Sequence, residues 1–349
     1  PYNNATFLLN ITNETSSADN ETSYINDDLE HFVSISVFIL FSFIFLAGLV
    51  GNGLVVMVVA ANPLMRSTTN ILIINLAVAD LLFVIICVPF TATDYILNSW
   101  PFGDFMCRFV QYMIFVTCHA SVYTLTLMSL DRFLAVVHPI SSIPYRNEIN
   151  ALLSIGIIWC LILFTGVPVM MSHGEATYLD RYNNTEQVKC VFLSEGYSLV
   201  AFQISFFLSS YVVPLTLISA LYVCMLVSLW KGQAPGVKAS AESRRGKRRV
   251  TRMIVAVVLG ENTLLLLSAL LFTINYCPFH VFVPIAFAIC WLPIQIVLVL
   301  KALELYHQTS FLIGVQIVSH VLAYSSSCIN PLLYAFLSEN FRKAFRKMM

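Results

Sequence analysis

The sequence predicts an all-α membrane protein, a seven-transmembrane helix bundle followed by a short amphipathic C-terminal helix. Of its 349 residues, 58% are hydrophobic and only 11% are charged, whereas soluble domains carry about 25% charged residues. Apolar stretches of more than about 18 residues recur along the chain, and each could cross a bilayer as a helix. This composition argues against a soluble enzyme. The 19 basic residues cancel the 19 acidic residues, so the net charge gives no indication of a nucleic-acid partner.

The first 31 residues are polar and acidic, and we expect them to form a glycosylated extracellular tail. One sequon often arises by chance, but four within 22 residues favour a segment that reaches the secretory lumen. The chain starts at Pro1 without an initiator Met or a visible signal peptide, so we expect the sequence to be a fragment at its N-terminus. Whether it is also a fragment at its C-terminus stays open. The four sequons begin at Asn4, Asn10, Asn13 and Asn20.

The charge distribution predicts the orientation of the bundle, which we place at residues 32–337. With the N-terminus outside, seven crossings leave the C-terminus in the cytosol. Of the 19 basic residues, 15 then lie on the inner side, as the positive-inside rule requires. A fifth sequon, at Asn183, falls in an outer loop. We therefore expect a multi-pass plasma-membrane protein. The predicted spans are residues 33–61, 71–97, 105–137, 149–171, 197–230 and 311–336, with one more inside 250–303.

Two of the nine cysteines differ from the others by their position. Most lie inside spans, where cysteine acts as a small apolar residue. Cys107 opens the third span on its outer side, and Cys190 lies in the outer loop between the fourth and fifth spans. Both face an oxidising compartment, so we expect a disulfide between them, with two free thiols as the alternative.

Asp80 lies roughly 14 Å deep in the second span, near the bilayer midplane. A buried charge there costs about 2.5–3.5 kcal/mol, so it must find partners inside the bundle. A carboxylate with hydroxyl and amide oxygens suits a hard cation. A protonated Asp in a static hydrogen-bonded cluster is an equal alternative. The candidate partners are Asn52, Ser121, Ser326 and Asn330.

Polar and helix-distorting residues recur at fixed places in the other spans. Asp131 and Arg132 lie at the end of the third span. An alternative explanation is that they form an interfacial acid–base pair whose long side chains reach water. Pro331, after Asn330, and Pro293, after Trp291, each remove a backbone hydrogen bond inside a span. A mid-membrane acid, an inner Asp-Arg and two such kinks are uncommon together.

These landmarks resemble those of rhodopsin-like (class A) G-protein-coupled receptors over about residues 33 to 347. Within that family, the stretch from Met128 to Ile140 and the short basic third inner loop resemble insect allatostatin-A receptors, relatives of galanin receptors. Phe133 replaces the Tyr usual in the family. The matching residues are Gly51-Asn52, residues 76–80, residues 100–103, Cys107, Asp131-Arg132-Phe133, Trp159, Pro214, Tyr222, residues 290–293 and residues 330–334.

The resemblance implies a receptor, not an enzyme, that transmits binding of an extracellular peptide to a heterotrimeric G protein, expected to be of the inhibitory type. It implies no cofactor apart from an allosteric sodium ion held by Asp80, Asn52, Ser121, Ser326 and Asn330. Activation would move the inner end of the sixth helix outward and free Arg132 from Asp131. The residues expected to take part are Asp131, Arg132, Tyr222, Trp291, Pro293, Asn330, Pro331 and Tyr334.

The ligand class follows partly from residues that the family uses and this sequence lacks. Residues 105–118 contain no Asp or Glu, so the carboxylate with which family members bind biogenic amines is missing. Ile114 occupies the helix face where that carboxylate would lie. Residues 311–336 contain no Lys, so retinal cannot attach. The polar outer loop, residues 173–193, alternates as a hairpin would near Lys189, which suits a peptide. The candidate peptide contacts, each equally open to ordinary packing, are Gln111, Ile114, Phe115, Gln295, Leu298, His320 and Tyr324.

Residues 338–349 predict an amphipathic helix on the inner leaflet, where the membrane lipid is a partner. A receptor for another peptide is the first alternative function. A polytopic secondary transporter is a distant one, because no internal repeat is visible and Asp80 is the only deep acid in the first five spans.

The sixth span is too long. Arg249 and Pro293 are 44 residues apart, about 66 Å as a helix against roughly 30 Å of hydrocarbon. Deleting residues 259–286 leaves about 24 Å to the kink and restores a span that resembles the family's. We therefore expect an insertion at about 259–286, from a retained intron, alternative splicing or a gene-model error, that impairs signalling. We also expect the chain to break at Pro278 and Pro284.

Overall fold

The computed structural model describes residues 18–62, 67–97, 99–179, 186–231, 278–306, 309–337 and 339–348. Among these residues, seven helical segments are long and apolar enough to cross a membrane. They match the seven predicted spans in order. The predicted seven-helix bundle with a short C-terminal helix is thus confirmed.

The elements follow one another in a simple order along the chain. Two of the spans, the second and the fifth, are each divided by a π-helical turn, in which the chain takes one residue more per hydrogen-bonded ring than an α-helix does. The elements are α1 (Ala18–Ala61), α2 (Thr68–Leu82), η2 (Phe83–Cys87), α3 (Val88–Ile96), α4 (Gly103–Val137), α5 (Glu148–Ser172), β1 (His173–Leu179), β2 (Glu186–Phe192), α6 (Leu199–Phe207), η3 (Leu208–Val212), α7 (Val213–Lys231), α10 (Pro278–Ala302), α11 (Ser310–Leu337) and α12 (Glu339–Met348).

Helix starts follow the local sequence. Three helices are preceded by a capping residue with an extended backbone: Ser67, Asn147 and Ser198. The side-chain oxygen of each accepts a hydrogen bond from a backbone N–H three residues later. Such caps satisfy amide groups that have no partner within the helix. The short polar connections therefore fix where α2, α5 and α6 begin.

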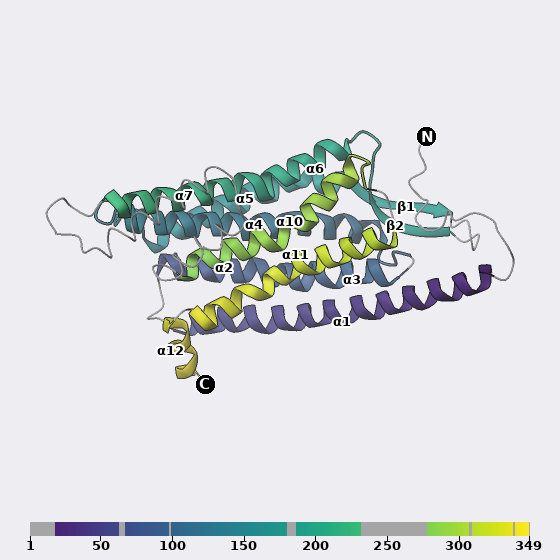
Figure 1. Ribbon diagram of the computed structural model, residues 1–349. Coiled ribbons are helices and arrows are strands. Elements are labelled where there is room, and N and C mark those ends of the chain that lie inside the picture. The colour runs from purple at the N-terminus through teal and green to yellow at the C-terminus, as the bar shows by residue number, and fades with distance from the viewer. Residues whose placement is uncertain are drawn as a thin grey trace.

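The core of the bundle lies around α4, which runs between the other helices (Figure 1). Leu76 and Val84 of the second span and Val116 and Val122 of the third are fully buried. By contrast, α5 turns most of its apolar residues outward, Phe164 among them. An apolar outward face is what a helix in contact with lipid requires.

The two ends of the bundle carry different elements (Figure 1). The antiparallel hairpin of β1 and β2, which we call the outer hairpin, lies at one end, and α12 lies at the other. In α12, Phe341 and Ala344 are buried while Arg342 and Lys343 are exposed. Both the predicted hairpin and the predicted amphipathic helix are present.

The predicted insertion at 259–286 lies mostly outside the described residues, and it stays a prediction. Its last nine residues, 278–286, are helical and continue without interruption into Phe287. Pro278 is the first residue of α10, a position that proline tolerates because its N–H would have no partner there. Pro284 lies inside the helix. The expected break at Pro284 is therefore wrong.

Candidate functional site

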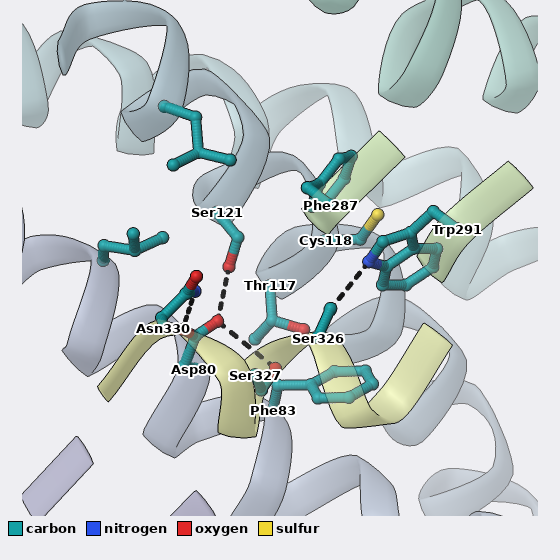
Figure 2. A pocket seen from close by; sticks show the side chains of 12 residues that line it. Asp80, Phe83, Thr117, Cys118, Ser121, Phe287, Trp291, Ser326, Ser327 and Asn330 are labelled. Carbon is teal, nitrogen blue, oxygen red and sulfur yellow. Dashed lines mark hydrogen bonds between the residues drawn. The ribbon is translucent and has the colours of Figure 1, made fainter. Parts of the chain in front are cut away.

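Asp80 is buried in the centre of the bundle, and three side chains donate hydrogen bonds to its carboxylate (Figure 2). Ser121 Oγ lies 3.0 Å and Ser327 Oγ 3.3 Å from Oδ1, and Asn330 Nδ2 lies 2.8 Å from Oδ2. We call these four residues the polar cluster. It joins the second, third and seventh spans, and these bonds offset the desolvation of the acid.

Two of the four expected partners do not contact Asp80. Ser326 accepts a hydrogen bond of 3.0 Å from Trp291 Nε1 instead. Asn52 donates to the carbonyl oxygens of Gly48 and Ser327, at 3.0 and 2.9 Å. Ser121 and Asn330 contact Asp80 as expected. Ser327, which we did not predict, takes the place of Ser326.

A small cavity lies beside the polar cluster (Figure 2). Its volume is about 10 Å³, roughly what one water molecule needs. Its lining includes Asp80, Ser121, Ser326, Ser327 and Asn330, together with apolar and aromatic side chains. One carboxylate and several hydroxyl and amide groups around such a space fit a single small cation with a preference for oxygen.

Trp291 lies on the opposite side of this cavity from Asp80 (Figure 2). Its ring stacks on Phe287, with centroids 5.6 Å apart, and its Nε1–H reaches Ser326 on α11. Pro293 follows two residues later inside α10. The part of α10 that precedes Pro293 is therefore linked to the same stretch of α11 that supplies Ser327 and Asn330.

The C-terminal end of α4 is arranged differently from our expectation. Asp131 Oδ1 forms an ion pair with Arg146 Nε at 2.9 Å, and Oδ2 accepts a hydrogen bond from Thr69 Oγ1 at 2.9 Å. Arg132 Nη2 donates to Thr69 Oγ1 at 2.7 Å. The expected direct pair of Asp131 and Arg132 is thus wrong in this structure, because the Thr69 hydroxyl connects them.

The remaining activation candidates, Tyr334, Tyr222 and Pro331, lie on α11 and α7. Tyr334 is buried, and its ring centroid is 6.4 Å from that of Phe341 in α12. Tyr222 is half-buried against the core. Pro331 lies inside α11 directly after Asn330, so this proline adjoins a member of the polar cluster.

The predicted disulfide attaches the outer hairpin to α4. Cys107 and Cys190 are bonded, with their Cα atoms 5.5 Å apart. Gln111 lies one helical turn further along α4, and its Nε2 is 3.9 Å from Cys190 Sγ. Of the candidate peptide contacts, Gln111 is therefore the one directly beside the outer hairpin.

The candidates on α11 take part in hydrogen bonds between helices. His320 Nδ1 is 2.7 Å from Tyr95 OH, which also accepts a bond of 3.2 Å from Gln316 Nε2. Tyr324 OH is 2.8 Å from Thr91 Oγ1, and the Tyr324 side chain is buried. Packing within the bundle accounts for Tyr324, whereas His320 is half-buried in a polar group that includes residues we did not predict.

The candidates on α4 and α10 also have partners inside the bundle. Gln295 is 1% exposed, and its Nε2 donates to Ser210 Oγ at 3.0 Å. Phe115 lies against His119, with ring centroids 4.0 Å apart. Ile114 and Leu298 are half-buried against the core. These contacts describe packing, and the role of these residues in peptide binding stays a prediction.

Several residues in these contacts could not be identified from sequence alone. His119 is buried in α4, and its Nε2 is 3.0 Å from Ser209 Oγ in η3. Arg146 lies 15 residues after Asp131, beyond the end of α4. Spacing on a helix predicts neighbours only three or four residues apart, so contacts of this kind leave no signal in the sequence pattern.

The predicted glycosylation sites are mostly beyond the described part of the chain. Asn4, Asn10, Asn13 and Asn183 lie outside the described residues. Asn20 belongs to the first turn of α1. Glycosylation at all five positions stays a prediction.

Known proteins resemble this chain over nearly its whole length. The family described as "7 transmembrane receptor (rhodopsin family)" matches residues 51–334. The chain is 59% identical to the allatostatin-A receptor of Bombyx mori over 349 aligned residues, which cover 99% of this chain and 89% of the relative. It is 36% identical to galanin receptor type 2 of Mus musculus, over 90% of this chain and 76% of the relative. For galanin receptor type 2 of Homo sapiens the identity is 37%, over 90% and 73%.

Proposed function

The chain belongs to the rhodopsin family of seven-transmembrane receptors, and from this premise we propose that it is a G-protein-coupled receptor for a neuropeptide of the allatostatin-A or galanin type. The observation that carries the proposal is the 59% identity to the silkworm allatostatin-A receptor across 99% of the chain. At 36–37%, the galanin receptors are less similar. An allatostatin-A peptide is therefore the first ligand to test.

We assign the hairpin end to the extracellular side and the α12 end to the cytosol. The disulfide belongs to an oxidising compartment, and it lies at the hairpin end. The exposed Arg342 and Lys343 of α12 suit the anionic inner leaflet. A peptide would then enter beside Gln111 and the outer hairpin, and a G protein would bind beside Arg132.

The hydrogen bonds inside the bundle support a route for the signal. Trp291 on α10 contacts Ser326 on α11, and the adjacent Ser327 contacts Asp80 on α2. A peptide that shifts the outer part of α10 would disturb these bonds and change the relative energies of two arrangements of the bundle. At the inner end, Arg132 is held by one neutral hydroxyl, that of Thr69, and could exchange this bond for a contact with the G protein.

The polar cluster would hold a sodium ion in one of these arrangements. Asp80, Ser121, Ser327 and Asn330 would supply the oxygen ligands, and Ser326 lines the same cavity. The ion would neutralise the carboxylate and favour the state in which the cavity stays open. An inhibitory type of G protein is the partner that we propose on the cytosolic side.

The function can be tested in cells that express the chain together with a promiscuous G protein. Synthetic allatostatin-A and galanin peptides are applied at increasing concentration, and nucleotide exchange on the G protein is measured. We expect an allatostatin-A peptide to stimulate exchange at lower concentration than galanin does. No response to either peptide, in cells where the receptor is present at the surface, would contradict the proposal. Exchange with purified inhibitory and stimulatory G proteins then identifies the subtype.

A further inference from the structure

Both strands of the outer hairpin are held from the same face of α4. Glu175 on β1 lies directly opposite Cys190 on β2. Cys190 is bonded to Cys107, and the backbone N–H of Glu175 donates a hydrogen bond of 3.0 Å to Asp104 Oδ1. Asp104 and Cys107 are three residues apart, so they lie on one face of the helix. The residue pair Glu175 and Cys190 forms one rung of the hairpin, and this rung is thus held at both of its ends.

The orientation of the Asp104 carboxylate is itself fixed. Its Oδ2 accepts a hydrogen bond of 2.6 Å from Arg108 Nε, one turn further along α4. Arg108 Nη1 also donates to the carbonyl oxygen of Met170 in α5, at 3.4 Å. The Asp104 and Arg108 side chains are 48% and 31% exposed, and an exposed ion pair adds little to stability. Its effect is to keep the other carboxylate oxygen directed at the Glu175 N–H.

The sequence leaves room for this contact. A Cβ atom at Gly174 would lie 2.9 Å from Asp104 Oδ1 and 3.0 Å from Arg108 Nη2, so the ion pair would have to shift away from β1 to make room for it. Gly174 therefore allows the backbone of β1 to come within hydrogen-bonding distance of the ion pair.

The contact on β1 adds what a disulfide alone does not provide. A single bridge to β2 leaves the hairpin able to turn about the bonds of that bridge, and an isolated two-stranded hairpin is only marginally stable. The outer edge of β2 has further support. The Val188 carbonyl oxygen accepts a hydrogen bond of 2.7 Å from Trp100 N–H, and the Val188 N–H donates one of 3.1 Å to Ser99 Oγ. Asp104 supplies the corresponding support for β1.

We propose that Asp104 is a positioning residue for peptide binding, which fixes the tilt of the outer hairpin over the bundle and so sets how fast a bound peptide leaves. The proposal rests on the peptide-receptor function proposed above. Gln111 contacts Cys190 on this hairpin, so a peptide bound beside Gln111 must pass the hairpin on its way out. Movement of such a cover commonly limits release, and affinity differences between related complexes arise mainly in the dissociation rate.

The first experiment compares variants that differ by one group. Asp104→Ala removes both contacts. Asp104→Asn keeps an oxygen for the Glu175 N–H but loses the charge. Glu175→Gln is the matched control, because it removes a negative charge from the same rung and leaves the backbone N–H in place. Dissociation of a labelled allatostatin-A peptide is measured for each receptor.

We expect Asp104→Ala to speed dissociation about three- to tenfold, the effect of losing one charge-assisted hydrogen bond at a half-exposed site. Asp104→Asn should give an intermediate rate, and Glu175→Gln should stay within about twofold of the unmodified receptor. If Asp104→Ala fails to reach the cell surface, Asp104→Asn provides the same comparison. Equal rates for the Asp104 variants and Glu175→Gln would overturn the proposal.

A second readout needs no peptide. Hydrogen exchange of residues 172–176 is followed in the purified, unliganded receptors, after peptide mapping confirms an intact Cys107–Cys190 bridge. We expect faster exchange in Asp104→Ala than in Glu175→Gln, and equal exchange would again overturn the proposal. If the unmodified receptor bound no allatostatin-A peptide, the proposed function would fail, while the exchange comparison would still decide whether Asp104 holds β1.

Discussion

Adjacent charges in a sequence need not pair in the folded chain, as Asp131 shows. Successive side chains on a helix point about 100° apart, so Asp131 and Arg132 face different neighbours. Asp131 is buried and meets Arg146 and Thr69, whereas Arg132 donates a hydrogen bond to the Thr69 hydroxyl. The sequence identified both residues as important, but it could not reveal Arg146, because no helical spacing connects the second inner loop to α4.

The first prediction concerns Arg132. Replacing Arg132 with Ala should reduce peptide-stimulated nucleotide exchange by about tenfold or more, the usual effect of removing a buried, hydrogen-bonded charge from an interface. Peptide affinity and surface expression should change little, because Arg132 lies at the end of α4 opposite the disulfide. Exchange assays and surface labelling measure these effects. If nucleotide exchange were unchanged, Arg132 would have no role in activation and would be only an interfacial charge.

The polar cluster shows the limit of prediction at the residue scale. A buried acid in the second span required partners, and Ser121 and Asn330 were predicted correctly. Ser326 and Ser327 are adjacent, and each lies within one helical turn of Asn330. Spacing alone could not decide which of the two contacts Asp80, since that depends on the rotation of α11 around its own axis. The structure assigns Ser327 to Asp80 and Ser326 to Trp291.

The second prediction uses this distinction. Replacing Asp80 with Asn should abolish any effect of sodium on agonist affinity, because the amide keeps its hydrogen-bonding capacity but loses the charge. In linked sites, one ligand commonly changes the affinity for the other by about fivefold or more. Ser327→Ala should weaken the sodium effect more than Ser326→Ala, its matched control. Agonist binding with sodium, or with a large organic cation in its place, measures this. An equal sodium effect in all four receptors would leave the static hydrogen-bonded cluster as the explanation.

At the scale of elements, the outer hairpin was predictable in outline. Alternating residues near Lys189 indicated a strand, and the position of Cys107 and Cys190 indicated the bridge. The attachment of β1 was not predictable, because it depends on a backbone N–H. Nor was the buried position of His173, whose ring lies against Phe192 and Phe202 with centroids 5.3 and 5.4 Å away.

The third prediction follows from His173. Burial lowers the pKa of His173 below its usual value; its hydrogen bond to the Val169 carbonyl opposes this shift, and the nearby Arg108 adds to it. A base whose pKa is lowered by folding stabilises the fold fully above its unfolded pKa of about 6.5 and loses that contribution as the pH falls. Thermal unfolding of the purified receptor should therefore occur at lower temperature at pH 5.5 than at pH 7.5, by roughly 2–4 °C.

The control for this effect is a pair of histidine variants. His173→Phe keeps a ring but cannot be protonated, so the difference between the two pH values should shrink. His138→Phe changes an exposed histidine at the inner end and should leave the difference as it was. If both variants retain the full pH dependence, the titrating group lies elsewhere.

At the scale of the whole molecule, hydropathy and charge predicted most of the architecture. The length of apolar segments is set by bilayer thickness, so six spans could be located to within a few residues. The sixth span was the exception. Its apolar stretch is too long for one crossing, and α10 begins at Pro278 inside the predicted insertion. Hydropathy alone cannot decide which part of the apolar stretch within residues 250–303 forms the sixth helix of the bundle.

The fourth prediction addresses this competition. A receptor that lacks residues 259–286 should give stronger peptide-stimulated exchange than the full chain, because a continuous helix would then link the basic stretch near Arg249 to Trp291. Both forms are expressed, their surface levels are matched, and the transcript is sequenced across this region. Equal signalling by the two forms, with only the long transcript present, would make the segment a genuine part of the receptor.

The π-helical turn η3 has a consequence for the direction in which α6 faces. Between the same two flanking points, residues 208–212 contain one residue more than an α-helix would. Winding these same residues as a regular α-helix would rotate all of α6 by about 100° relative to α7. Phe202 would then turn away from His173, against which its ring lies. The face that α6 presents beside the outer hairpin therefore depends on this turn, and a regular helix one residue shorter would present that same face without it.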